Sequence, residues 1–343
     1  MRSVVGLLAL GLLFWSDGLY SQISQPAASL QLDADPQTVQ IPAGVVMYDP
    51  QCDSSGAVYV RYSSGNDSGP ATMVRVDGSG ETTTVPPLTM PDGSTPHVFL
   101  FAVGSDDSLD EIVRVPVAGD SAGDTEVRYV TFDPDGSLRR QAAFDDELIP
   151  STLLPLPSGG FFASGVVLQT ATEGLHEGPI AGIFSPDAQL KRRFRNTGRG
   201  LVSVSNTDKD NGDEIPLEGA ILRLGGDGTL YALLPDDAPR IDVFSQAGRV
   251  LRHMDLEQPF ANAVVDDMFL SGNRLLVVYE GQNDDEGKTS RYVMYDAQSG
   301  EVIRQYRPEF SGTAACFEDG QTLTVLVRQP SSGAIAIGTA ELE

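Results

Sequence analysis

The chain has 343 residues, 41% of them hydrophobic, and a formal net charge of −25. This hydrophobic content is sufficient for a buried core, and the negative charge argues against nucleic-acid phosphates and anionic membrane surfaces as partners. Cations, basic peptides and calcium are compatible with the charge, although solubility of an exported protein would also explain it. The 36 glycines and 22 prolines are typical of a turn-rich chain.

Met1–Ser21 predicts a secretory signal peptide. Arg2 precedes the apolar run VVGLLALGLLFW, and small residues follow this run. The run is shorter than the roughly 20 residues that a membrane span needs, so we expect cleavage near Gly18 or Ser21. We therefore expect a soluble monomer without a membrane span in the mature chain, periplasmic or secreted and bacterial in origin. Residues 22–29 are predicted to form a polar linker.

The segment Gly219–Leu256 predicts a four-stranded antiparallel meander, because turn signals separate four short apolar runs. Weaker copies of it recur with a period of roughly 40–50 residues, as in propeller blades. The turn between the third and fourth strands recurs as VDGSGE, FDPDGS, FSPDAQ, FSQAGR and YDAQSGE. The predicted blades are residues 45–88, 97–146, 153–196, 217–257, 265–309 and 313–342.

The last predicted blade lacks its fourth strand, and residues 30–41 (LQLDADPQTVQI) provide a spare one. We expect this N-terminal strand to complete the last blade and close the ring, because closure removes an exposed sheet edge. The prediction is thus an all-β chain with one six-bladed propeller domain over residues 30–343. A two-sheet sandwich or two small β domains is the alternative.

The fourth unit is similar to an NHL-type blade. It has Leu230-Tyr231, then Pro-Asp-Asp at 235–237, then Arg240-Ile241-x-Val243-Phe244 and Gly248. The other units fit only the general propeller pattern. The resemblance therefore implies an NHL-repeat-like six-bladed propeller at the level of the TolB-like superfamily.

The two cysteines are predicted to form a disulfide across the ring closure. Cys52 and Cys316 each stand four residues before a turn glycine, Gly56 and Gly320, so they occupy matching positions in the first and sixth units. These two units are neighbours in a closed ring, and an exported protein meets an oxidising environment. Two separate buried thiols are the alternative.

Most of the acidic loops are predicted to lie on one face. The second-to-third strand loops and the links between blades share this face, and several are long and acidic (66–68, 119–124, 173–177, 206–214, 236–237 and 283–286). Within them, Asn206, Asp208 and Asp210 place oxygen ligands at alternate positions, as in a calcium-binding loop. Gly212 falls one place late for an EF-hand-type loop, so a solvated acidic loop is the alternative.

No catalytic set emerges from the sequence. Ser121 lies in a GxSxG pattern, but a strand follows it where a nucleophile elbow needs a helix. The histidines fall in three blades, with His97 starting an inner strand, His176 in a loop and His253 in an outer strand. Candidate residues at the mouth of the propeller channel are Asp49, Arg223, Asp266 and Asp267.

The sequence thus favours an exported, non-catalytic module that binds a protein, peptide or glycan through its acidic loop face. The alternative is a metal-dependent hydrolase or lyase of the lactonase kind, acting in the channel.

Overall fold

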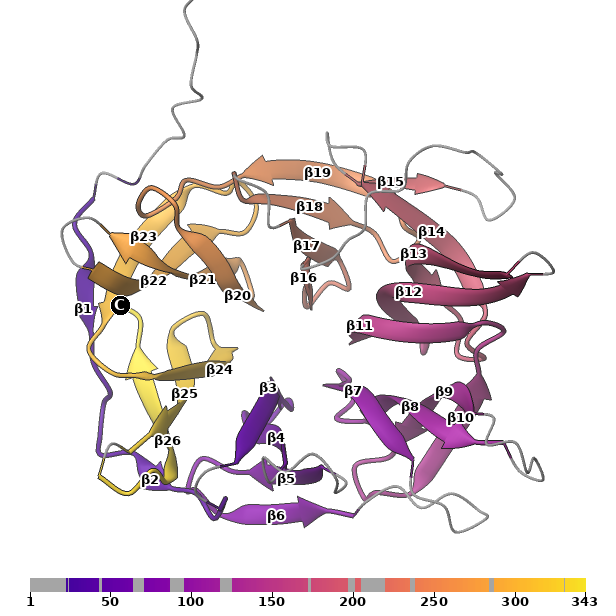
Figure 1. Cartoon of the computed structure of the whole chain (residues 1–343). Coiled ribbons are helices and arrows are strands. Elements are labelled where there is room, and N and C mark those ends of the chain that lie inside the picture. The colour runs from indigo at the N-terminus through magenta and orange to yellow at the C-terminus, as the bar shows by residue number, and fades with distance from the viewer. Residues whose placement is uncertain are drawn as a thin grey trace, which may run out of the picture.

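A computed structural model describes residues 23, 25–42, 45–63, 71–86, 96–117, 125–171, 174–196, 201–204, 220–234, 238–283, 287–329 and 331–343. These residues form strands and turns, arranged as six sheets of mainly antiparallel strands around a common axis (Figure 1). The chain is a six-bladed β-propeller, as the repeated strand and turn pattern predicted. The alternative of a sandwich or two small β domains is wrong.

The strands follow the predicted repeat closely. The first three blades are β3 to β6 (Val46–Cys52, Val58–Ser63, Thr72–Val76, Thr82–Val85), β7 to β10 (His97–Val103, Leu109–Pro116, Thr125–Phe132, Leu138–Ala143) and β11 to β15 (Glu147–Pro155, Phe161–Ala171, Gly174–Phe184, Leu190–Asn196, Leu201–Val204). The next two are β16 to β19 (Ile221–Leu224, Leu230–Leu234, Arg240–Phe244, Val250–Asp255) and β20 to β23 (Val264–Ser271, Arg274–Asn283, Gly287–Asp296, Val302–Pro308). The sixth has β24 to β26 (Gly312–Glu318, Thr322–Arg328, Ile335–Glu341).

Two N-terminal strands join the ends of the chain. β2 (Gln37–Thr38) pairs antiparallel with β26 and supplies the fourth strand of the sixth blade, so the predicted ring closure is confirmed. β1 (Ala28–Leu30) pairs parallel with β23 and adds a fifth strand to the fifth blade. The sequence analysis placed residues 28 and 29 in a linker, so it did not predict β1.

The core lies between the blades. Each apolar cluster draws its residues from two neighbouring blades, for example Tyr59 and Val113 between the first and second, or Phe162 and Leu222 between the third and fourth. One blade has too little apolar area to be stable by itself, so stacking around the ring buries both faces of every sheet. The resulting frame fixes where each loop begins and ends.

Tight turns connect the first and second strands and the third and fourth strands, and one kind of turn recurs in the first four blades. In the first blade, the Asp53 amide donates to the Ala57 carbonyl, and Gly56 has φ = 79°. The turn at Asp77–Glu81 repeats this pattern. A positive φ is comfortable for glycine, which explains the glycine at the end of most of these turns. This repeated turn is the sequence signal that marked the blades.

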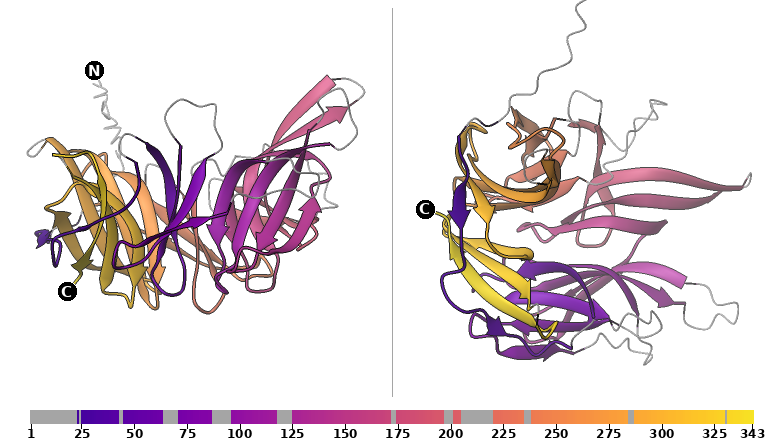
Figure 2. Two further views of the ribbon diagram at one scale, coloured as in Figure 1. Left: turned by 90° about the horizontal axis from the view of Figure 1, so that it is seen from below. Right: turned by 60° about the vertical axis from the view of Figure 1, so that its left-hand side comes forward.

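The third blade differs from its prediction. Residues 173–177 were expected to form a loop, but Gly174–Glu177 belong to β13, which pairs with β12 up to Ala171. Val166–Leu168 continue the apolar character of β12, so strand pairing extends further than in the other blades. This hairpin projects beyond its neighbours in Figure 2. β15 adds a further strand, which the sequence analysis assigned to the link between blades.

Candidate functional site

The loop face is the face on which the inner strands β3, β7, β11, β16, β20 and β24 begin. It carries the second-to-third strand loops and the links between blades, whereas the other face carries the tight turns; we call the latter the turn face. Much of the predicted acidic surface (64–70, 118–124, 205–219, 235–237 and 284–286) lies outside the described residues. This includes Asn206, Asp208, Asp210 and Ser121.

Two of the four candidates at the channel mouth form an ion pair. Arg223 of β16 and Asp267 of β20 meet with an Nη2–Oδ1 distance of 2.5 Å, which joins the fourth and fifth blades. The guanidinium also lies 5.5 Å from the centroid of the Phe269 ring. Asp266 is exposed beside this pair. Asp49 lies on β3, but its side chain is outside the described part of the structure.

A pocket opens on the loop face at the fifth blade. It has a volume of about 360 Å³ and is lined by Val264, Val265, Asp266, Glu280, Gly281 and Gln282. Val264 begins β20 and pairs with Glu280 near the end of β21, so the apolar and acidic parts of the pocket face each other across one strand pair. Val264 is 64% exposed, a large fraction for a valine in a strand.

The electrostatic field at this pocket is negative. Burial, followed by the charges of Asp266, Glu280 and Asp267, raises the pKa of the neighbouring Tyr292 well above its ordinary value. A cation entering the pocket meets these carboxylates together with the aliphatic surface of Val264 and Val265. The arrangement suits a group that is both apolar and positively charged.

Exposed apolar residues also occur on other inner strands. Val46 and Tyr48 of β3 are 51% and 36% exposed, and Ile149 of β11 is 42% exposed. They lie near the beginnings of their strands, as Val264 does, and so at the loop-face end of the ring. The sequence analysis considered only charged residues there and missed them. The available signal was an apolar residue at the first position of these inner strands, as at Val46 and Val264.

The three histidines do not come together. His97 begins β7, is exposed and lies 5.2 Å from the Phe99 ring, while His253 of β19 contacts the buried Asp242 at 2.5 Å. His176 lies on β13, not in the predicted loop, and its side chain is outside the described part. Among the side chains that the structure describes, no group of three or more His, Cys, Asp or Glu residues could hold a metal ion.

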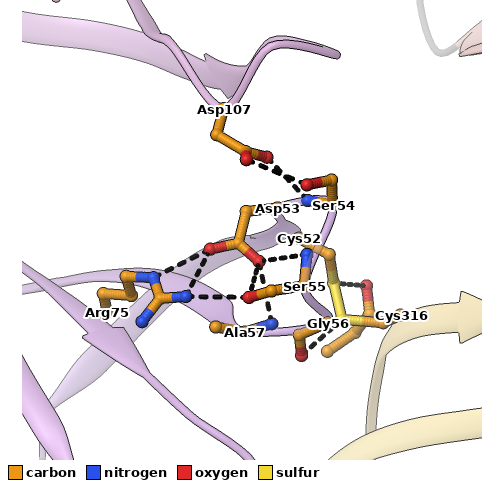
Figure 3. The surroundings of a disulfide bond; sticks show 10 residues. Cys52, Asp53, Ser54, Ser55, Gly56, Ala57, Arg75, Asp107 and Cys316 are labelled. Carbon is orange, nitrogen blue, oxygen red and sulfur yellow. Dashed lines mark hydrogen bonds and ion pairs between the residues drawn. A yellow bond between two sulfur atoms is a disulfide. The ribbon is translucent and has the colours of Figure 1, made fainter. Parts of the chain in front are cut away.

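Cys52 and Cys316 are joined by a disulfide in the structure, with Cα atoms 5.8 Å apart (Figure 3). The bond connects β3 of the first blade to β24 of the sixth, across the closure of the ring. Asp53 follows immediately and binds Arg75 at 2.7 Å. Burial by itself would raise the pKa of Asp53, but hydrogen bonds from Ser55, Arg75 and backbone amides bring it below its usual value.

The tight turn beside the disulfide also contacts the second blade. Asp107 accepts hydrogen bonds from the Ser54 amide at 2.7 Å and from the Ser54 hydroxyl at 2.9 Å. The turn face is thus held by contacts from the sixth blade through the first to the second (Figure 3).

Comparisons with known proteins identify the fold. No protein-family model matches the chain, and no curated protein matches it in sequence. Among solved structures, it is similar to a protein described as exported from Bacteroides fragilis, with a TM-score of 0.53 and 10% identity over 94% of this chain and 98% of that one. At these identities the likeness concerns the fold alone.

Two further structures have lower scores. A protein of unknown function from Bacteroides caccae has a TM-score of 0.45 and 13% identity, covering 78% of this chain and 83% of that one. A protein described as an oxidoreductase (glucose dehydrogenase) from Thermus thermophilus has a TM-score of 0.43 and 13% identity, covering 90% of this chain and all of that one.

Within the described ranges, no helix has the length and hydropathy to cross a membrane.

Proposed function

We propose that this protein is an exported, non-catalytic β-propeller that binds a basic segment of a partner protein or peptide on its loop face. The observation that carries the proposal is the pocket at the fifth blade, where the exposed Val264, the half-buried Val265 and two carboxylates line one cavity. The net charge of −25 acts in the same direction, because it attracts basic partners over a distance and raises the rate of encounter.

The pocket matches the two parts of a long basic side chain. The aliphatic stem of lysine or arginine packs on apolar surface while its charged end stays near water and near acids. In this pocket Val264 and Val265 provide the apolar surface, and Asp266 and Glu280 provide the charge. Loops and strand ends carried by a rigid frame are common binding positions, and the closed ring of blades provides that frame.

The test uses a fluorescent peptide of alternating leucine and arginine and the mature protein. We expect binding that weakens as salt is added, and that falls roughly tenfold in the double variant Asp266→Asn, Glu280→Gln, equivalent to about 1.4 kcal/mol. Glu280→Gln alone is compared with Glu301→Gln as its matched control, because each removes one charge from the same blade and Glu301 lies on the turn face. Equal binding of a leucine–glutamine peptide, or no loss in the double variant, would contradict the proposal.

Export and the metal-dependent alternative need separate measurements. We expect the mature N-terminus of the exported protein to follow Gly18 or Ser21, which N-terminal sequencing checks. Metal analysis of the purified protein, with thermal melts in the presence and absence of chelator, examines the loop at 206–214 and the channel. Bound metal together with a melting temperature that chelator lowers would point to the loop at 206–214 or to the channel, and only ligands mapped to the channel would favour the hydrolase or lyase alternative.

A further inference from the structure

A second pocket lies on the turn face, between the second and third blades. Its volume is about 170 Å³. The tight turn at the end of β7, the strands β9 and β10, and the turn between β11 and β12 all contribute to its wall. The residues that decide its chemistry are Asp106, Asp110, Tyr129, Thr131, Arg139 and Arg140.

Asp110 occupies a position that is aromatic in three other blades. It stands two residues after the tight turn between the first and second strands, where the first, third and fourth blades have Tyr59, Phe162 and Tyr231. Those rings are buried against the following blade. In the second blade the aromatic ring comes from the third strand, since Tyr129 of β9 stacks on Phe161 at 3.9 Å. The smaller Asp110 therefore lies beside a cavity.

Three hydroxyl groups surround the Asp110 carboxylate. Thr131 donates to it at 2.7 Å, Ser108 donates at 3.1 Å, and the Tyr129 hydroxyl donates to the same oxygen as Thr131. Asp110 is only 2% exposed, and burial raises the pKa of its carboxyl despite these hydrogen bonds. With their protons directed at Asp110, the three hydroxyl oxygens retain lone pairs as acceptors.

The outer part of the pocket contains both signs of charge. Arg139 binds Asp106 at 2.6 Å and also binds Asp133. Hydrogen bonds from Ser108, including its backbone amide at 3.3 Å, and from Arg139 lower the pKa of Asp106 to about 2. Arg140 lines the pocket beside them. A simple anion would meet Asp106 and Asp110, and a simple cation would meet the two arginines. A neutral ligand with many donors and acceptors avoids both penalties.

The volume of the pocket and its apolar side agree with a ligand that contains one six-membered ring. An engineered protein cavity of roughly 150 Å³ holds a benzene molecule, so about 170 Å³ accommodates one ring. Pro155, Leu156 and Pro157 form an apolar side, against which the C–H face of a sugar ring can pack. We propose that this pocket binds one monosaccharide unit, either free or at the end of a glycan, with Asp110 and its hydroxyl neighbours as the polar anchor.

The experiment is saturation-transfer NMR on the mature protein. The neutral probes are glucose, galactose, mannose, N-acetylglucosamine and the methyl glycosides of the first three, each at millimolar concentration. Ethanolamine and methyl phosphate are the charged probes, because both have the carbon-bound protons that this measurement detects. We expect transfer to at least one sugar or its glycoside and none to the charged probes. Transfer to the glycoside alone would identify a glycan end, and transfer to both forms would identify a free sugar as well.

Ser105→Trp blocks the pocket from an exposed turn position without changing the core. Gly226→Trp is its matched control, because Gly226 stands at the same place in the turn of the fourth blade and a side chain there meets open space. We expect Ser105→Trp to abolish transfer and Gly226→Trp to preserve it, with unchanged melting temperatures. Transfer to no sugar, transfer to a charged probe, or a sugar signal that survives Ser105→Trp would overturn the proposal.

Discussion

Removing the bond between Cys52 and Cys316 should strongly destabilise the propeller. The two residues are 264 positions apart, so the bond closes most of the chain into one loop. In the chain-entropy treatment, a loop of that length restricts the unfolded chain by roughly 5–6 kcal/mol, and residual structure in the unfolded chain reduces this to an expected 3–5 kcal/mol. The non-covalent strand closure is short, since β2 and β26 share only two residue pairs, Gln37–Ile337 and Thr38–Ala336.

The measurement compares three forms of the mature protein by denaturant unfolding and by thermal melting: oxidised, reduced, and the double variant Cys52→Ala, Cys316→Ala. Each 1 kcal/mol corresponds to about 2 °C in a domain of this size, so we expect a fall on the order of 10 °C. The reduced protein keeps the packing of both sulfur atoms, so its difference from the alanine variant isolates the packing contribution. Two titratable thiols in the oxidised protein, or an unchanged melting temperature on reduction, would refute the reasoning.

Two further substitutions test the stability argument at the second and third blades. Burial raises the pKa of Glu111 to about 7, so the folded state holds a proton that the unfolded chain releases near pH 4.5. The free energy of unfolding should therefore fall by roughly 3 kcal/mol as pH rises from 4.5 to 7. In urea unfolding, Glu111→Gln should lack this fall, and its free energy of unfolding at pH 8 should exceed that of the wild type. Phe161→Ala should cost roughly 3–5 kcal/mol, because the fully buried ring stacks on Phe184 and Tyr129, whereas Leu138→Ala, at an exposed position, should cost little by the same assay.

The sequence predicted the architecture because the blade is a local unit. Its strand lengths follow from alternating apolar runs, and most of its turns have glycine at a position of positive φ, so both leave a readable pattern in the copies. Cys52 and Cys316 stand at matching positions before Gly56 and Gly320, so the repeat pattern also predicted the contact between the first and sixth blades. Repeat proteins favour such inference, since a position in one unit places its counterpart in all others.

The sites were harder to predict because they depend on contacts between blades. Asp267 was identified as a channel residue, but its pairing with Arg223 depends on how the fourth and fifth blades are rotated relative to each other. An apolar residue in a strand is ordinarily expected in the core. The exposure of Val264 was therefore not predicted, because it depends on the position of the start of β20 relative to the neighbouring blades. The sequence analysis did not single out Asp110, because its burial is a result of packing between blades.

The second strand of the second blade combines these observations. It carries Asp110–Glu111 where other blades have Tyr59–Val60, Phe162–Ala163 and Tyr231–Ala232, and both acidic side chains are at least 95% buried. Two consecutive buried carboxyls cost free energy that an aromatic–aliphatic pair would not, and strand alternation directs them toward opposite neighbouring blades. Packing alone therefore does not account for this pair. Departures from a local rule at a single blade are expected where a binding function compensates for the lost stability, and the proposed sugar site at Asp110 is consistent with that expectation.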